Sequence, residues 1–316
     1  MFQTEVGADR VGGRRPLKVG IQLPEVEREV RWPELRDMAG VAEDAGFDSL
    51  WVGDHLLFRD PDRPPRGPWE AWSVLAALAA ITERVELGPL VASASFHSPA
   101  MLAKKAATID EISGGRLILG LGAGWNEVEY RAFGFPFDHR VDRFEEAFAI
   151  IRALLREGEV DFSGRYHEAK ECLLLPPAAR PKGPPIMIGT TGARMLRLAA
   201  AHADAWNAWF TCYGNRPEGI AGLREEVDAA CLSVGRDPAT LERTAAVLVQ
   251  VEDGEVARRG GPQEKAPPLR GSTEELAGAL QSFAAEGIRH VQLVVDPITV
   301  GSIEWLGPLL ERLGRS

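Results

Sequence analysis

The sequence contains little cysteine and no long hydrophobic run. Its 316 residues include three cysteines, an odd number without a C-x-x-C pair: Cys172, Cys212 and Cys231. This usage argues against a disulfide framework and suits a reducing compartment. No stretch of about 18 uncharged apolar residues occurs, so the sequence predicts no membrane span and no membrane partner. We therefore expect a cytoplasmic protein.

Basic residues are fewer than acidic ones. There are 36 Lys and Arg against 46 Asp and Glu, a formal net charge of -10. An acidic surface repels phosphate backbones, so we expect no nucleic-acid partner. The sequence also lacks H-x-H, H-E-x-x-H and Walker motifs, and it therefore predicts no metal site. No lysine lies at the end of a predicted strand, which argues against a Schiff-base aldolase.

The sequence does have a regular alternation of short apolar runs and amphipathic segments of helical length. We count about eight such units, which predicts an α/β fold of the (β/α)8 TIM-barrel type. The predicted strands are 17–23, 47–52, 85–91, 116–120, 185–188, 203–209, 244–251 and 291–295. The predicted helices are 32–45, 68–82, 99–112, 140–157, 193–202, 217–234, 273–286 and 303–313.

A doubly wound open sheet would give a similar alternation. That fold places a G-x-G-x-x-G fingerprint after its first strand, where this sequence has Gln22-Leu23-Pro24-Glu25 instead. We therefore expect one barrel domain over 17–316, preceded by a flexible leader at 1–16. A Pro- and Gly-rich insertion is expected at 158–184, and the polar loop 252–271 is long enough to be a candidate lid.

The active site of such a barrel lies at the carboxyl ends of its strands. The second predicted strand ends in Val52-Gly53-Asp54-His55. A carboxylate beside an imidazole could bind a polar heterocycle and move a proton near neutral pH. In the alternative interpretation, Asp54 only caps the following loop and His55 is an ordinary surface residue.

The third and fourth predicted strands end in small residues. Around Ser93, hydroxyl residues replace the apolar run and would let a flat ligand approach the backbone, although a plain turn would look much the same. The fourth strand leads into Gly120-Leu121-Gly122-Ala123-Gly124-Trp125-Asn126. Its glycines would clear space and Asn126 would supply both a donor and an acceptor, while glycines also serve tight bends.

The fifth predicted strand runs almost directly into a helix. The junction Gly189-Thr190-Thr191-Gly192 precedes Ala193. It combines free backbone N–H groups, two hydroxyls and the positive end of a helix dipole, which together accept a phosphate. An ordinary helix cap would need only one of the two threonines.

Several of these segments resemble the coenzyme F420-dependent oxidoreductase branch of the bacterial luciferase-like family. They are Val-Gly-Asp-His (52–55), Leu-Ala-Lys-Lys-Ala-Ala-Thr-Ile-Asp (102–110), Ser-Gly-Gly-Arg-Leu (113–117) and Gly-Leu-Gly-Ala-Gly-Trp-Asn-Glu (120–127). The similarity covers nearly the whole chain from Leu17 onward. It implies a luciferase-like barrel with an inserted segment, a homodimer, and F420 as the cofactor, with FMN as the alternative.

The resemblance also implies roles for particular residues. Asp54 and His55 would contact the deazaflavin ring as catalytic residues, with His55 the proton donor or relay. The implied contacts to the cofactor ring, side chain and phosphate are Ser93, Gly122, Ala123, Asn126, Gly189, Thr190, Thr191, Gly192 and Ala193. A non-proline cis peptide is expected near Ala92-Ser93. Segment 123–125 lacks the catalytic glutamate of the sugar-phosphate dehydrogenase members, so the sequence departs from them.

Three functions follow from this interpretation. In the first, the chain transfers a hydride between F420 and an unidentified small organic substrate. In the second, it is an FMN-dependent luciferase-like monooxygenase that uses O2 and a partner reductase. In the third, it binds a flavin or deazaflavin without turnover.

Overall fold

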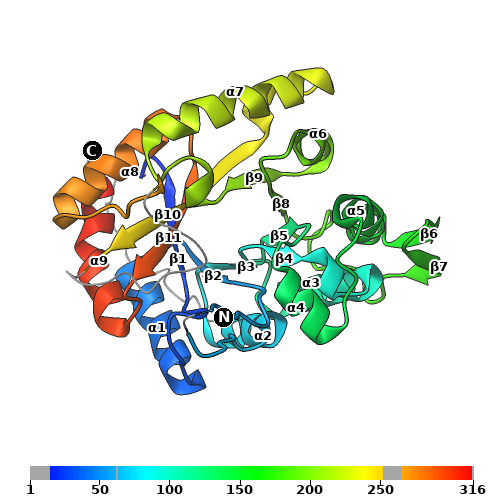
Figure 1. Ribbon diagram of the computed structural model, residues 1–316, viewed down its shortest axis with the longest axis horizontal. Helices are drawn as coiled ribbons and strands as arrows, with labels where there is room; N and C mark the ends of the chain where they lie inside the picture. The colour runs from blue at the N-terminus through cyan, green and yellow to red at the C-terminus, as the bar shows by residue number, and fades with distance from the viewer. Residues whose placement is uncertain (1–14, 62, 252–264, 315–316) are drawn as a thin grey trace, which may run out of the picture.

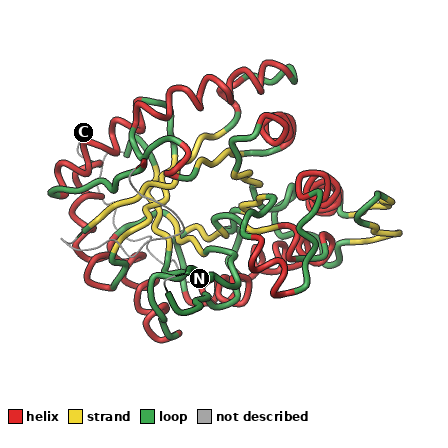
Figure 2. Tube along the Cα trace, viewed as in Figure 1, coloured by secondary structure: helices red, strands yellow, loops and turns green. Residues whose placement is uncertain are grey.

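The computed structural model describes residues 15–61, 63–251 and 265–314. Its centre is a ring of parallel strands enclosed by helices (Figures 1 and 2). Nine strands form one sheet in the order β3-β2-β1-β11-β10-β9-β8-β5-β4. They are β1 (Lys18–Gln22), β2 (Ser49–Val52), β3 (Glu86–Pro89), β4 (Ala92–Ser93), β5 (Leu119–Gly122), β8 (Ile186–Gly189), β9 (Ala205–Ala208), β10 (Glu242–Gln250) and β11 (His290–Asp296).

The two end strands of this sheet, β3 and β4, share one position in the barrel. They follow each other along the chain, and β3 pairs with β2 whereas β4 pairs with β5. A parallel bridge joins Leu87 to Leu117, and the amide of Ile118 donates to the carbonyl of Leu87 at 2.7 Å. The sheet therefore closes into the eight-position barrel that the sequence predicts, and the open doubly wound alternative is excluded.

Helices cover the outside of the barrel (Figure 1). Four of them match their predicted bounds at both ends: α1 (Trp32–Ala45), α3 (Pro99–Ile112), α5 (Arg140–Glu157) and α6 (Ala193–His202). The others on this surface are α2 (Ala71–Ile81), α7 (Pro217–Ser233), α8 (Thr273–Ala285) and α9 (Val300–Leu313). No described helix is both long enough and apolar enough to span a membrane.

Helix α1 illustrates why these bounds could be predicted. Pro33 occupies its first turn, where the missing N–H of proline is tolerated, and Gly46 ends it at a φ of 94°. Leu35, Met38 and Ala42 are buried on one face. The signals that start, bury and end this helix all lie within its own sequence.

The fourth predicted strand, 116–120, is displaced. The structure begins β5 at Leu119, whereas Leu117 forms only an isolated bridge with Leu87 and Arg116 lies before the sheet. The guanidinium of Arg116 donates to the carbonyls of Ala79, Thr82 and Val85 at 2.7 to 3.0 Å. The sequence analysis also missed the short helix α4 (Glu127–Phe133).

The expected insertion at 158–184 lies outside the nine-stranded sheet. It contains a two-stranded hairpin, β6 (Glu159–Ser163) and β7 (Glu168–Leu173), which projects from the barrel on the right in Figure 1. Residues 1–14 of the expected leader and 252–264 of the expected lid lie outside the described residues.

The described residues next to these two segments contact the barrel. Arg15 pairs with Asp48 at 2.6 Å. Within the described part of the expected loop 252–271, Leu269 forms a parallel bridge with Val249 of β10.

Candidate active site

The ends of β2 and β4 are joined through a buried carboxylate. Asp54, 4% exposed, accepts a hydrogen bond from the amide of Ser93 at 3.0 Å. The same oxygen lies 3.2 Å from Nε2 of His97. Two of the predicted site residues, Asp54 and Ser93, are therefore in direct contact at the carboxyl end of the barrel.

His55 is held by a glutamate that the sequence analysis did not identify. Its Nδ1 lies 2.8 Å from Oε1 of Glu129, which is 1% exposed on α4. The other oxygen of Glu129 accepts the amides of Leu56 at 2.8 Å and Leu57 at 3.3 Å. A carboxylate can only accept hydrogen bonds, so Nδ1 of His55 is the donor. Its Nε2 is then the nitrogen left for a ligand, and it lies 3.9 Å from Oε1 of Glu25.

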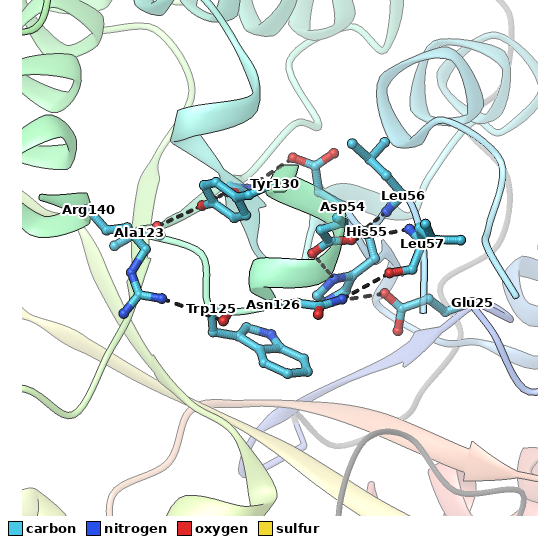
Figure 3. Close-up of polar contacts among 12 residues, drawn as sticks. Glu25, Asp54, His55, Leu56, Leu57, Ala123, Trp125, Asn126, Tyr130 and Arg140 are labelled. Carbon is cyan, nitrogen blue, oxygen red and sulfur yellow. Dashed lines mark hydrogen bonds and ion pairs between the residues drawn. The ribbon is translucent and has the colours of Figure 1, made fainter. Parts of the chain in front are cut away.

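The surroundings of His55 favour its protonated form. Burial lowers the pKa of His55, but the negative charges of Glu25, Glu129 and Asp54 together raise it above its ordinary value of 6.5. Figure 3 shows Asp54, Asn126 and Glu25 around the His55 side chain. The carboxylates around the imidazole thus stabilise its protonated form.

Tyr130 connects β4 to the segment after β5. Its hydroxyl donates to the carbonyl of Ala123 at 3.0 Å and accepts from Oγ of Ser93 at 2.8 Å. Burial raises the pKa of Tyr130. Gly124 has a φ of 75°, and a Cβ there would lie 1.8 Å from the Tyr130 hydroxyl. A glycine is therefore required at 124 for both its conformation and its small size.

The glycines of β5 and β8 make room for another part of the same chain. A Cβ at Gly122 would lie 2.9 Å from Cγ2 of Val91, and one at Gly189 would lie 3.1 Å from the same atom. The sequence analysis expected the glycines of segment 120–124 to clear space, and at Gly122 the side chain of Val91 occupies that space. The non-proline cis peptide joins Leu90 to Val91, two residues before the expected Ala92-Ser93.

Asn126 and Trp125 flank the site in different ways. Asn126 is 9% exposed, and its amide nitrogen donates to the carbonyl of Leu57 at 3.0 Å. Its predicted contact with a cofactor stays a prediction. Trp125 is 57% exposed. Its ring lies edge-on to the His55 ring, at 5.5 Å between centroids, and is tilted against the Phe58 ring at 6.1 Å.

The junction between β8 and α6 keeps its helix end open. The amide of Gly192 donates to Oγ1 of Thr190 at 3.2 Å, and no side chain caps the helix. Residues 191–194 are exposed. This donor set suits a phosphate, and the predicted phosphate contacts of 189–193 stay a prediction. Arg194 is engaged by Asp142 at 2.6 Å and by Glu145 at 2.5 Å.

Four residues of this site were missed: Glu25, His97, Glu129 and Tyr130. Glu129 and Tyr130 lie on α4, which was not predicted, and a buried glutamate cannot be told from a solvated one in a single sequence. Glu25 was noted only as part of the segment that replaces a nucleotide fingerprint. Their roles depend on contacts between segments far apart in the chain.

Comparisons with known proteins identify the family and the fold of this chain. Residues 16–279 match the model of a family described as luciferase-like monooxygenase. A 5,10-methylenetetrahydromethanopterin reductase of Archaeoglobus fulgidus is 31% identical over 236 residues, 75% of this chain and 65% of that protein. A phthiodiolone/phenolphthiodiolone dimycocerosates ketoreductase of Mycobacterium bovis is 33% identical over 228 residues, 66% of this chain and 59% of that protein. The chain thus spans less than two thirds of the length of each relative.

Among solved structures, the fold resembles an F420-dependent secondary alcohol dehydrogenase in complex with an F420-acetone adduct. The TM-score is 0.78 at 21% identity, and the match covers 94% of this chain and 99% of that one. This likeness shows the shared barrel. The family match spans well over half of the sequence and includes every residue of the candidate site. The chain belongs to the luciferase-like monooxygenase family.

Proposed function

We propose that this chain is an F420-dependent oxidoreductase that transfers a hydride between the deazaflavin and a small organic substrate. The observation that carries the proposal is the setting of His55, whose Nδ1 is bound to Glu129 while its Nε2 is left for a ligand. Support for the cofactor comes from the F420-dependent dehydrogenase of similar fold. Support for a reduction comes from the relatives, which are reductases. The expected enzyme class, an oxidoreductase, is common to these proteins.

The residues present fit such a cofactor. The open amino end of α6, with Thr190 and Thr191 beside it, has the donors that a phosphate needs. At the strand ends, Asp54, Ser93 and Ala123 belong to one hydrogen-bonded assembly that could support a flat ring. The deazaflavin, when bound, supplies or accepts the hydride.

The chain itself provides orientation and a proton. In the direction of reduction, His55 Nε2 donates its proton to the substrate oxygen, and Glu129 keeps the imidazole ring in a fixed orientation. The raised pKa of His55 favours the form of the imidazole that carries this proton. In the direction of oxidation, the same nitrogen receives the proton.

Cofactor titration tests this proposal most directly. Purified protein is titrated separately with F420 and FMN, and the dissociation constants are measured. We expect F420 to bind. His55→Ala should abolish turnover and keep F420 binding, whereas the exposed His202→Ala should leave both unchanged. Tight binding of FMN without binding of F420 would contradict the proposal.

The family description favours one alternative, an FMN-dependent monooxygenase that uses O2 and a partner reductase. That enzyme would consume O2 in proportion to product, whereas F420-dependent hydride transfer proceeds without oxygen. A protein that binds the cofactor and shows no turnover with any substrate under either condition would instead be a non-catalytic binding protein.

We also propose that the chain forms a homodimer. Helix α2 has no charged side chain, and its Ile81 is exposed, as are Met101 and Ile112 on the neighbouring α3. Exposed apolar side chains on adjacent helices are typical of an interface. Light scattering should give twice the mass of one chain, and Ile81→Glu should shift the protein toward a monomer. A monomeric wild-type protein would contradict this part of the proposal.

A further inference from the structure

Trp125 is an exposed aromatic residue in an otherwise buried group. It lies between Gly124 and Asn126, and its side chain extends beside His55 (Figure 3). Residue 125 is 57% exposed, whereas Asn126 is 9% and Phe58 is 7% exposed. The indole meets the imidazole of His55 edge-on at 5.5 Å between ring centroids. It therefore presents a large apolar surface at the barrel mouth, next to the group proposed to move the proton.

The charge around His55 restricts what can bind there. The carboxylates of Asp54, Glu25 and Glu129 are all less than 9% exposed, and each acts on the charge of His55. Three carboxylates therefore adjoin the imidazole of His55, and an anionic group brought to the same ring would lie close to them. A substrate whose reacting end is anionic would be repelled, whereas a neutral polar group can accept the proton of Nε2 without this cost.

The exposed ring of Trp125 and the proton of His55 Nε2 lie close enough together to act on one substrate. An atom that accepts the proton of His55 Nε2 must lie within about 3 Å of it. The rest of a substrate larger than a few atoms then lies near the aromatic rings of Trp125 and Phe58, which stand 5.5 and 4.7 Å from the imidazole. Aromatic faces and edges contribute most to the binding of apolar and planar groups.

We propose that Trp125 binds the hydrocarbon part of the substrate, and that the substrate is a neutral ketone or aldehyde carrying an aryl or alkyl group. This inference rests on the proposed function. In the direction of reduction the carbonyl carbon receives the hydride of the reduced deazaflavin, the oxygen receives the proton of His55 Nε2, and the C=O bond becomes CH–OH. The deazaflavin is oxidised in the same step. Trp125 thus selects the substrate by its apolar part.

The first test measures binding without turnover. Acetophenone is added to the cofactor-free protein and to the protein with oxidised F420, and tryptophan emission is followed. We expect saturable quenching that is lost in Trp125→Phe and retained in Trp305→Phe, since Trp305 lies on α9 and is also partly exposed. Absence of quenching in both forms of the wild-type protein, or equal loss in the two variants, would overturn the proposal.

The second test separates substrate binding from cofactor binding. With F420 and an aryl ketone, Trp125→Ala should raise KM about tenfold and change the dissociation constant of F420 less than about twofold. Acetophenone should bind at least about tenfold more tightly than 4-acetylbenzoate or glucose 6-phosphate. An unchanged KM, or preference for either anion, would overturn the proposal. Failure of F420 to bind would instead contradict the proposed function, while quenching of Trp125 would remain measurable.

Discussion

His55 and Glu129 form a hydrogen bond of 2.8 Å between Nδ1 and Oε1, across 74 positions of the sequence. Glu129 binds two backbone amides with its other oxygen, so it fixes both the imidazole and the segment that follows it. The bond leaves Nε2 as the nitrogen that can exchange a proton with a ligand. The orientation of His55, which follows β2, is therefore set by Glu129 on α4, the helix that follows β5.

Replacing Glu129 by Gln should change the pH dependence of turnover. The pKa of His55 is raised in part by Glu129, so removing this charge lowers it, and the loss of activity with rising pH should begin at a lower pH. We also expect kcat to fall by about tenfold or more, because a mispositioned acid transfers its proton poorly. Steady-state rates from pH 5 to 9 measure both effects. Glu127→Gln, an exposed change on the same helix, is the control. An unshifted profile would show that Glu129 has only a structural role.

His290 should make the protein sensitive to acid. Burial, and then the charge of Lys18, lowers the pKa of His290 to about 3, against an ordinary value of 6.5. The unfolded chain binds this proton below pH 6.5 and the folded chain does not, so stability is lost as pH falls from 6.5 toward 3. At pH 4 the loss is about 3 kcal/mol.

Urea unfolding at pH 7 and pH 4 tests this prediction with His290→Asn, which has no group titrating in this range. The variant should lose about 3 kcal/mol less than the wild type between the two pH values. The exposed His139→Gln should follow the wild type. Parallel losses in all three proteins would disprove the assignment to His290.

Removal of the Asp54 carboxylate should loosen the junction of β2 and β4. In Asp54→Ala the buried amide of Ser93 loses its acceptor, which costs about 1 to 3 kcal/mol of stability. Asp54→Asn keeps an oxygen that can accept from this amide and should recover much of the loss. The exposed Asp44→Asn serves as the control. If Asp54→Ala unfolds at the wild-type urea concentration, the contact does not support the junction.

The pair formed by Asp110 and Arg180 should be important for stability. Asp110 is fully buried on α3, and Arg180 donates to its two oxygens at 2.9 and 2.5 Å. Arg180→Ala leaves a buried carboxylate without its cation, at a cost of about 3 to 5 kcal/mol. Thermal and urea unfolding measure the loss, with the exposed Glu111→Ala as control. A loss below about 1 kcal/mol would mean that the carboxylate is satisfied by other groups.

The barrel could be predicted from the sequence because its repeats carry local signals. Helix α3 begins with a proline after Ser98, and α8 begins at a capping box formed by Ser272 and Glu275, so each helix marks its own start. The displaced β5 begins after Arg116, whose bonds reach three carbonyls from earlier in the chain. Such contacts cannot be derived from periodicity.

The candidate site was predicted in part for a related reason. Asp54 and Ser93 follow strands whose carboxyl ends must meet in a barrel, so the fold alone brings them together. The partners of His55 come from a short helix and a loop without a strong pattern, and only the folded chain places Glu129 and Glu25 beside it. Trp125 belonged to a recognised motif, but its exposure could be found only in three dimensions.

The packing of Val91 against Gly122 and Gly189 limits how this chain could diverge. A Cβ gained at Gly122 would lie 2.9 Å from Cγ2 of Val91 and one at Gly189 would lie 3.1 Å from it, so either change requires the valine to shift. Mutational routes to a new selectivity therefore pass through positions such as 125, where the side chain can be exchanged without disturbing the barrel. Sequences derived from this one would therefore keep Val91, Gly122 and Gly189 and vary at position 125.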